Sequence, residues 1–124
     1  MTDRLNDSIE KEVREARRLD GAAVAAEIRE GLRSRIDAFS QKSGRPLTLG
    51  ILLAGNDPGS EIYVRNKMKS GENLGMVTDL RRLDDGASLD EALAIVRTFN
   101  DSPKHDGILV QSPLPEGMGA DAEQ

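Results

Sequence analysis

The stretch Leu47-Thr-Leu-Gly-Ile-Leu-Leu-Ala54 decides the fold, because it is short and almost wholly apolar. It is bounded by Gly44 and Pro46 on one side and by a cluster of turn-forming residues, 55–59, on the other. A run of this length between turn signals favours a strand that is buried on both faces. Helices and further strands are therefore expected around it.

Upstream of this strand, apolar residues recur every three or four positions. This spacing predicts an amphipathic helix from Ala22 to about Lys42, which Gly44 and Pro46 end. The predicted buried stripe of this helix consists of Ala25, Ile28, Leu32, Ile36 and Phe39. Residues 1–18 are rich in charge and poor in apolar positions, so we expect a charged leader ahead of a single domain over residues 19–124.

Downstream of the strand, two further helices alternate with two further strands. The helices are predicted over Ser60–Leu74 and Ser88–Asn100, and the strands over Met76–Leu83 and Gly107–Val110. The last helix begins with a capping box formed by Ser88 and Glu91. Its predicted apolar stripe consists of Leu89, Leu93, Val96 and Phe99. Regular alternation predicts parallel strands joined by right-handed crossovers, and hence an α/β fold: a three-layer α/β/α sandwich with a small, mostly parallel sheet.

Composition excludes several classes of protein. The 124 residues include 17 Lys and Arg against 22 Asp and Glu, a formal net charge of −5, which argues against binding nucleic acid through phosphate neutralisation. The sequence has no Cys, which excludes disulfide scaffolds, thiolate metal sites and a Cys nucleophile. Its one His, His105, disfavours a multi-histidine metal site and is expected in a surface loop ahead of the last strand. No apolar signal segment or membrane span is present, so we expect a cytoplasmic protein.

Ligands of open parallel sheets bind beyond the carboxyl ends of the strands, and two polar segments of this sequence fall there. The first is the turn at 55–60 with the helix that follows, in which Ser60, Tyr63 and Lys67 share one face. Partial burial of the Tyr63–Lys67 pair would disfavour the charged ammonium and make the amine competent for proton transfer. The alternative is an exposed Tyr–Lys pair on a solvated helix.

The second segment is Gln111-Ser-Pro-Leu-Pro115. Its two prolines cannot continue a central strand, so Gln111 presents a neutral amide from stiff backbone, able to hold a lysine or the edge of a heterocycle. The alternative is a surface Gln at a capped strand end. A Lys, a Tyr and a Gln at one edge of the sheet together predict a site for a substrate with polar ring edges. No G-x-G-x-x-G or Walker loop is present, so no dinucleotide site is expected in this chain.

Two of these stretches resemble the signatures of a known family. Tyr63-Val-Arg-Asn-Lys67-Met-Lys, preceded by Asn56-Asp-Pro-Gly-Ser60, resembles the hallmark segment of the bifunctional methylenetetrahydrofolate dehydrogenase/methenyltetrahydrofolate cyclohydrolase enzymes. Asp106-Gly-Ile-Leu-Val-Gln-Ser-Pro-Leu-Pro115 resembles their second signature, and Leu19-Asp20-Gly21 fits ahead of the first helix. The resemblance runs from about Leu19 to Met118.

This resemblance implies a catalytic domain that binds folate in a cleft against a separate NADP-binding Rossmann domain, which the present chain lacks. It implies NADP-dependent oxidation of 5,10-methylenetetrahydrofolate to the 5,10-methenyl compound, and hydrolysis of that cation to 10-formyltetrahydrofolate. This chain would supply the folate-binding catalytic half of a cytoplasmic homodimer that serves one-carbon metabolism and purine biosynthesis.

The motif match also implies roles for single residues. Lys67 corresponds to the catalytic lysine that transfers a proton during hydrolysis, Tyr63 to the residue that packs on and hydrogen-bonds the folate, and Gln111 to the amide that orients the lysine. The other implied substrate-binding positions are Ser60, Val110 and Pro113. Because the methenyl carbon carries delocalised positive charge, a neutral Lys67 is expected to accept a proton from the attacking water.

The sequence departs from the family pattern at Ser112, where an apolar residue is usual, and at Ser70-Gly71, where Ala-Cys or Ala-Ala is usual. Gly71 is expected to weaken its helix. The family's Asp-Val-Asp-Gly stretch lies beyond the second motif, so the domain is expected to be incomplete at its C-terminus. Two alternatives remain: a short-chain dehydrogenase, disfavoured by the missing Gly-rich loop, and a non-catalytic folate-binding or interaction module built on the same residues.

Overall fold

The computed structural model describes residues 16–124 of the chain. Its elements are α2 (Gly21–Ser43), β1 (Thr48–Ala54), α3 (Pro58–Asn73), β2 (Val77–Leu83), α4 (Leu89–Asp101), β3 (Gly107–Val110) and the short 3-10 helix η1 (Glu116–Met118). The three strands form one parallel sheet in the order β2-β1-β3, which confirms the predicted α/β class. Of the leader predicted over residues 1–18, residues 1–15 lie outside the described residues.

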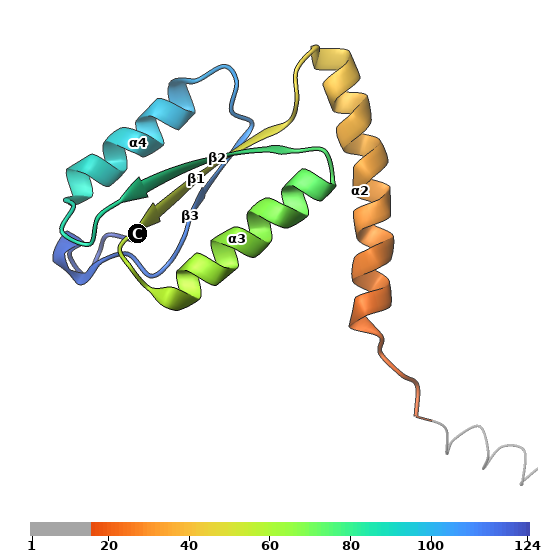
Figure 1. Ribbon diagram of the computed structural model, residues 1–124, viewed down its shortest axis with the longest axis horizontal. Coiled ribbons are helices and arrows are strands. Elements are labelled where there is room, and N and C mark those ends of the chain that lie inside the picture. The colour runs from red at the N-terminus through yellow and green to blue at the C-terminus, as the bar shows by residue number, and fades with distance from the viewer. Residues whose placement is uncertain (1–15) are drawn as a thin grey trace, which may run out of the picture.

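The central strand β1 separates two apolar clusters, one on each face of the sheet. Ile51 and Leu53 pack with Val64 of α3, whereas Leu52 and Ala54 pack with Ala92 of α4. Successive side chains of a strand point to opposite faces, so a nearly continuous apolar run serves both helices at once. The sandwich therefore has α3 on one face of the sheet and α4 on the other (Figure 1).

The helix α4 confirms its predicted capping box and corrects its predicted stripe. Both capping bonds are present, from the Glu91 amide to Ser88 Oγ and from the Ser88 amide to the Glu91 carboxylate. Phe99 and Ala92 are buried, but Leu93 is 38% exposed. The expected burial of Leu93 is wrong because this side chain points into an open groove between α4 and β3.

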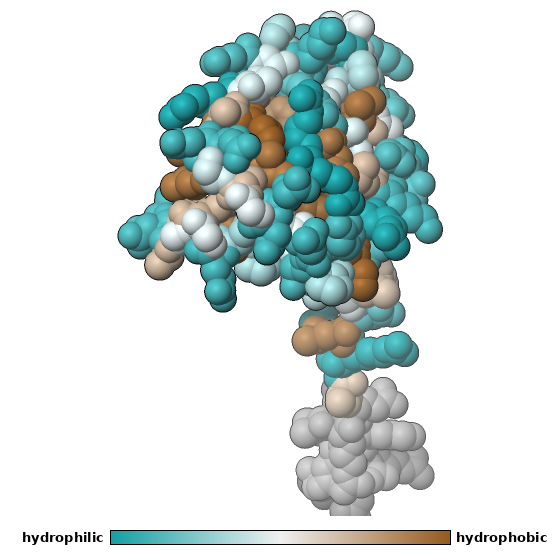
Figure 2. Space-filling model, turned by 60° about the vertical axis from the view of Figure 1, so that its left-hand side comes forward, coloured by the Kyte–Doolittle hydropathy of each residue, from teal (hydrophilic) through white to brown (hydrophobic). Residues whose placement is uncertain are grey.

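The predicted burial of the α2 stripe is also wrong at Ile28. Ile36 is buried and Leu32 half-buried, but Ile28 is 57% exposed. Figure 1 shows α2 at one end of the sandwich, projecting past it rather than lying on the sheet, and Figure 2 shows hydrophobic surface (brown) where the helix leaves the body. The periodicity correctly marks an apolar face, but only its C-terminal half meets the body. None of the helices over residues 16–124 could span a membrane.

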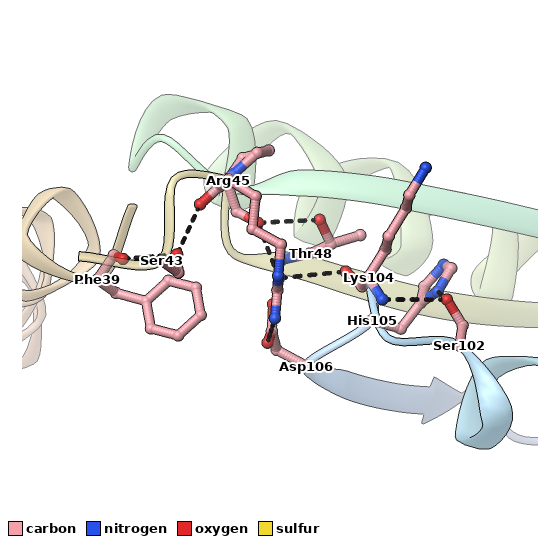
Figure 3. Close-up of polar contacts among 9 residues, drawn as sticks. Phe39, Ser43, Arg45, Thr48, Ser102, Lys104, His105 and Asp106 are labelled. Atoms are coloured by element: carbon pink, nitrogen blue, oxygen red, sulfur yellow. Dashed lines mark hydrogen bonds and ion pairs between the residues drawn. The ribbon is translucent and has the colours of Figure 1, made fainter. Parts of the chain in front are cut away.

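A polar cluster ties the end of α2 to the amino ends of β1 and β3 (Figure 3). Arg45 donates to both carboxylate oxygens of Asp106, at 2.7 and 2.6 Å, and its guanidinium lies 5.4 Å from the centre of the Phe39 ring. The Thr48 amide donates to the same carboxylate at 3.0 Å. The hydrogen bonds from Arg45 lower the pKa of Asp106 from 3.8 to about 2.

His105 lies at this amino end, opposite the strand ends that carry the candidate site, but the prediction of a surface position is wrong. Its side chain is only 11% exposed and its ring lies 4.8 Å from that of Phe99. One ring nitrogen is 2.7 Å from Ser102 Oγ and the other 2.8 Å from an Asp79 carboxylate oxygen. The ring is largely covered because it packs against Phe99, and each of its nitrogens has a polar partner.

Candidate functional site

The first half of the candidate site is set by the start of α3. Asp57 caps the helix by accepting a hydrogen bond from the Ser60 amide at 2.8 Å, and Pro58 occupies the first turn. Sequence reasoning started this helix at Ser60 and missed Asp57, although an Asp followed by Pro is a start signal. From this start, Ser60, Tyr63 and Lys67 follow on one face of α3.

The turn before α3 packs directly against the second half of the site. Gly55 has a φ of +88°, and its amide donates to the Leu83 carbonyl at 3.0 Å. A Cβ at this position would lie 3.0 Å from Asp85 Oδ1 and 3.2 Å from Pro115 Cγ. Only glycine allows both the left-handed backbone and this close approach. Because Gly55 belongs to the first predicted segment and Pro115 to the second, the two segments lie in contact.

The structure joins Lys67 and Gln111 by a hydrogen bond. The Lys67 Nζ donates to Gln111 Oε1 at 2.7 Å, although the two residues are 44 positions apart in the sequence. Gln111 follows β3 directly. Its backbone amide donates to the Leu52 carbonyl at 3.0 Å, which extends the pairing of β3 with β1 by one residue. The expected convergence of these two residues at one sheet edge is therefore present in the structure.

The orientation of the Gln111 amide follows from its second hydrogen bond. Its Nε2 donates to the Ser112 carbonyl at 2.8 Å, so Oε1 is the atom that faces Lys67. The same carbonyl accepts from Ser60 Oγ at 3.2 Å, and Ser60 is only 2% exposed. A buried hydroxyl thus holds the carbonyl that orients the amide, and the amide holds the lysine. Sequence reasoning missed the role of the Ser112 carbonyl, since a backbone acceptor leaves no mark in a sequence.

The expected partial burial of the Tyr63–Lys67 pair is wrong within residues 16–124. Tyr63 is 62% exposed and Lys67 is also exposed, because no described element covers this face of α3. Pro113 lies open as well, whereas Val110 (41% exposed) lines the groove between α4 and β3 together with Leu52, on the other face of the sheet from α3. The site is therefore an open face with aromatic and aliphatic surface around one amine and one amide.

Two grooves among residues 16–124 lie away from Lys67. A groove of about 280 Å³ runs between α3 and β2, with Arg65, Lys69 and Arg82 among its lining residues. In it, Arg82 binds both carboxylate oxygens of Glu61 at 2.6 Å, which lowers the pKa of that carboxyl. A second groove of about 350 Å³ lies between α4 and β3. Neither contains Lys67, so shape alone does not mark the candidate site, and its hydrogen bonds do.

Comparison with known proteins identifies relatives over most of the chain. Residues 19–123 match the family described as tetrahydrofolate dehydrogenase/cyclohydrolase, catalytic domain. The bifunctional protein FolD of Hyphomonas neptunium is 44% identical over 107 residues, covering 86% of this chain and 35% of the relative. FolD of Maridesulfovibrio salexigens is 41% identical over 100 residues, covering 81% of this chain and 35% of the relative. The chain thus spans about 35% of the length of these curated relatives.

Solved structures agree with this match. The bifunctional FolD methylenetetrahydrofolate dehydrogenase/cyclohydrolase of Campylobacter jejuni superimposes with a TM-score of 0.76 at 34% identity, covering 82% of this chain and 36% of that one. A 5,10-methylenetetrahydrofolate dehydrogenase from the silkworm Bombyx mori gives 0.78 at 32% identity, covering 85% and 36%. Sequence family, sequence relatives and fold coincide, which removes the short-chain dehydrogenase alternative. This chain therefore belongs to the tetrahydrofolate dehydrogenase/cyclohydrolase family, whose catalytic domain its residues 19–123 match.

Proposed function

We propose that this chain binds a tetrahydrofolate derivative on the face formed by Tyr63, Lys67 and Gln111. There it supplies the folate-binding half of an enzyme that oxidises 5,10-methylenetetrahydrofolate to the 5,10-methenyl compound and hydrolyses that cation to 10-formyltetrahydrofolate. The observation that carries the proposal is the 2.7 Å hydrogen bond between Lys67 Nζ and Gln111 Oε1 in a chain of this family. The cytoplasmic location, the homodimer and the link to purine biosynthesis belong to the same proposal.

The exposed surface around the amine suits a flat ligand. Tyr63 presents an aromatic face, and Pro113 presents aliphatic surface beside Gln111. A pterin ring laid on this surface would bury it and pair its polar edge with the amide. The ligand itself would then remove water from Lys67, so the burial that the sequence led us to expect arises on binding.

Hydrolysis needs a group that takes a proton from water next to a cationic carbon. A neutral Lys67 amine has one lone pair and two N–H groups, one of which donates to Gln111 Oε1. As the water oxygen bonds to the methenyl carbon, its proton passes to the lone pair of Lys67 Nζ. One ring C–N bond then breaks: the departing nitrogen takes the proton held by Lys67 Nζ, and the new hydroxyl loses its proton to solvent and becomes the formyl carbonyl. The positive charge of the substrate favours the neutral amine, since two like charges side by side are unfavourable.

The oxidation step needs a hydride acceptor that this chain does not hold. Its sequence has no Gly-rich dinucleotide loop. The trypanosome relative, with a TM-score of 0.74 and 28% identity, is described as complexed with NADP cofactor and inhibitor, and this chain covers 34% of it. We therefore assign NADP to a domain outside the 124 residues, and assign to this chain the binding of folate and the positioning of the lysine.

The proposal is tested by measuring, with the whole chain, binding of 5,10-methenyltetrahydrofolate and the rate of its hydrolysis. We expect saturable binding, and a Lys67→Met variant that loses hydrolysis by about a hundredfold, the usual contribution of a general base. Lys69→Met is the matched control, because Lys69 lines the groove on another side of α3 and should behave as the wild type. Absence of binding, or equal hydrolysis by Lys67→Met and the wild type, would overturn the assignment.

The remaining alternative is a non-catalytic folate-binding module. The observation on its side is that Lys67 is exposed among the described residues. Saturable binding with a hydrolysis rate no higher than that of the free compound would favour this alternative over the enzyme.

A further inference from the structure

The segment that carries Gln111 has an unusual shortage of backbone donors. Pro113 and Pro115 have no N–H group, so over residues 113–115 the amide of Leu114 is the one donor available. This amide donates to Glu123 Oε1 at 2.8 Å. Leu114 is half-buried and Glu123 is exposed, so this bond lies at the protein surface, where a carboxylate of the C-terminal segment takes the place of water as the acceptor.

The C-terminal segment is built to bring this carboxylate back to the site loop. Met118 is 6% exposed and lies in the α4-side cluster with Leu52. The chain then reverses at Gly119, whose φ is +100°, and the Ala122 amide donates to the Gly119 carbonyl at 3.2 Å. Ala122 packs against the same cluster. The position of Glu123 therefore follows from two apolar anchors and one turn.

We propose that Glu123 is a positioning residue that holds the Gln111–Pro115 loop in the geometry that joins Gln111 to Lys67. The near side of the loop is held by two hydrogen bonds. The Gln111 backbone amide donates to the Leu52 carbonyl, and the Ser112 carbonyl accepts from Ser60 Oγ. Glu123 fixes the far side, beyond the first proline. The expected effect on folate binding rests on the proposed function, whereas the expected effect on the Leu114 hydrogen bond does not.

The hydrogen bond from Leu114 to Glu123 is tested on the whole ¹⁵N-labelled chain by the rate at which the Leu114 backbone amide exchanges its hydrogen with water. E123A removes the acceptor, and we expect exchange to become about five- to tenfold faster. E123Q keeps an oxygen at the same reach and should restore the wild-type rate. Glu116, an exposed carboxylate in the same segment, provides the matched control E116A, which should leave the rate unchanged. If E123A fails to fold, E123D, which is one methylene too short to reach, should show the same acceleration.

The positioning role is tested by the side-chain amide resonances of Gln111 and by the dissociation constant for 5,10-methenyltetrahydrofolate. In E123A we expect the Gln111 resonances to move and the dissociation constant to rise about fivefold, with E123Q restoring both. Unchanged Leu114 exchange or unmoved Gln111 resonances in E123A and E123D would overturn the inference. If the wild type does not bind the folate but the exchange pattern holds, the proposed function fails and the role of Glu123 stands.

Discussion

A methyl group added at Gly50 tests whether α4 is locked against the central strand. An ideal Cβ at this position would lie 2.8 Å from Cδ1 of Phe99 and 2.9 Å from its Cε1, closer than real Cβ contacts come. The ring has little freedom to withdraw, because Phe99 is 1% exposed and packs against the His105 ring at 4.8 Å. His105 in turn is held by Asp79 and Ser102.

The size of the effect follows from two opposing contributions. Overpacking a close-packed site costs about 1–3 kcal/mol. Replacing glycine by alanine in a strand recovers about 0.5–1 kcal/mol of backbone entropy. The midpoints of the two ranges, about 2 and about 0.75 kcal/mol, predict that Gly50→Ala lowers the free energy of unfolding by roughly 1 kcal/mol.

Gly71→Ala is the matched control for this prediction. Gly71 is also buried, but a Cβ there would lie 3.5 Å from Thr78 Cγ2 and 3.7 Å from Met76 Cβ, which are ordinary contacts. Removing a glycine from inside α3 should raise the free energy of unfolding by up to about 1 kcal/mol. Urea unfolding followed by circular dichroism measures both variants. A Gly50→Ala protein as stable as the wild type, or a Gly71→Ala protein equally weakened, would refute this account of the packing.

Three further predictions concern the ends of the sheet, and each is checked by chemical denaturation. Because Arg45 holds the pKa of Asp106 at about 2, below its ordinary 3.8, the carboxylate stabilises the fold above about pH 4 and this contribution is lost as the pH falls towards 2. Asp106→Asn should lower stability at pH 7 by on the order of 1 kcal/mol and flatten this acid dependence; an unaltered acid limb would contradict it. Ser60→Ala should cost about 1 kcal/mol, because it removes a bond to the Ser112 carbonyl, and equal stability would show that bond to be unimportant. Gly55→Ala should cost about 1–2 kcal/mol, since its φ of +88° suits only glycine; wild-type stability would argue against the tight turn.

The sequence allowed the central sheet to be predicted because burial on two faces leaves a direct trace. The run over residues 47–54 is apolar at both odd and even positions, so it identifies the middle strand. The meeting of Lys67 and Gln111 could be predicted for a related reason, since parallel strands bring their carboxyl ends to one edge.

The features that could not be predicted depend on partners far away in the sequence. The apolar face of α2 is visible in the sequence, but the sequence does not show that the helix leaves the body between Ile28, which is exposed, and Leu32, which is half-buried. The burial of His105 depends on Asp79, 26 residues earlier. The exposure of Tyr63 depends on what else covers α3, and helical spacing carries no information about that.

We propose that Lys67 and Gln111 together form the folate-binding face. Titration of the ¹⁵N-labelled chain with 5-formyltetrahydrofolate, a stable tetrahydrofolate derivative, tests it most directly. We expect the side-chain amide of Gln111 and the backbone amide of Tyr63 to shift most, and Lys67→Met to weaken the shift of Gln111. An unmoved Gln111, with the largest shifts instead at Arg65 and Arg82 in the groove between α3 and β2, would contradict it.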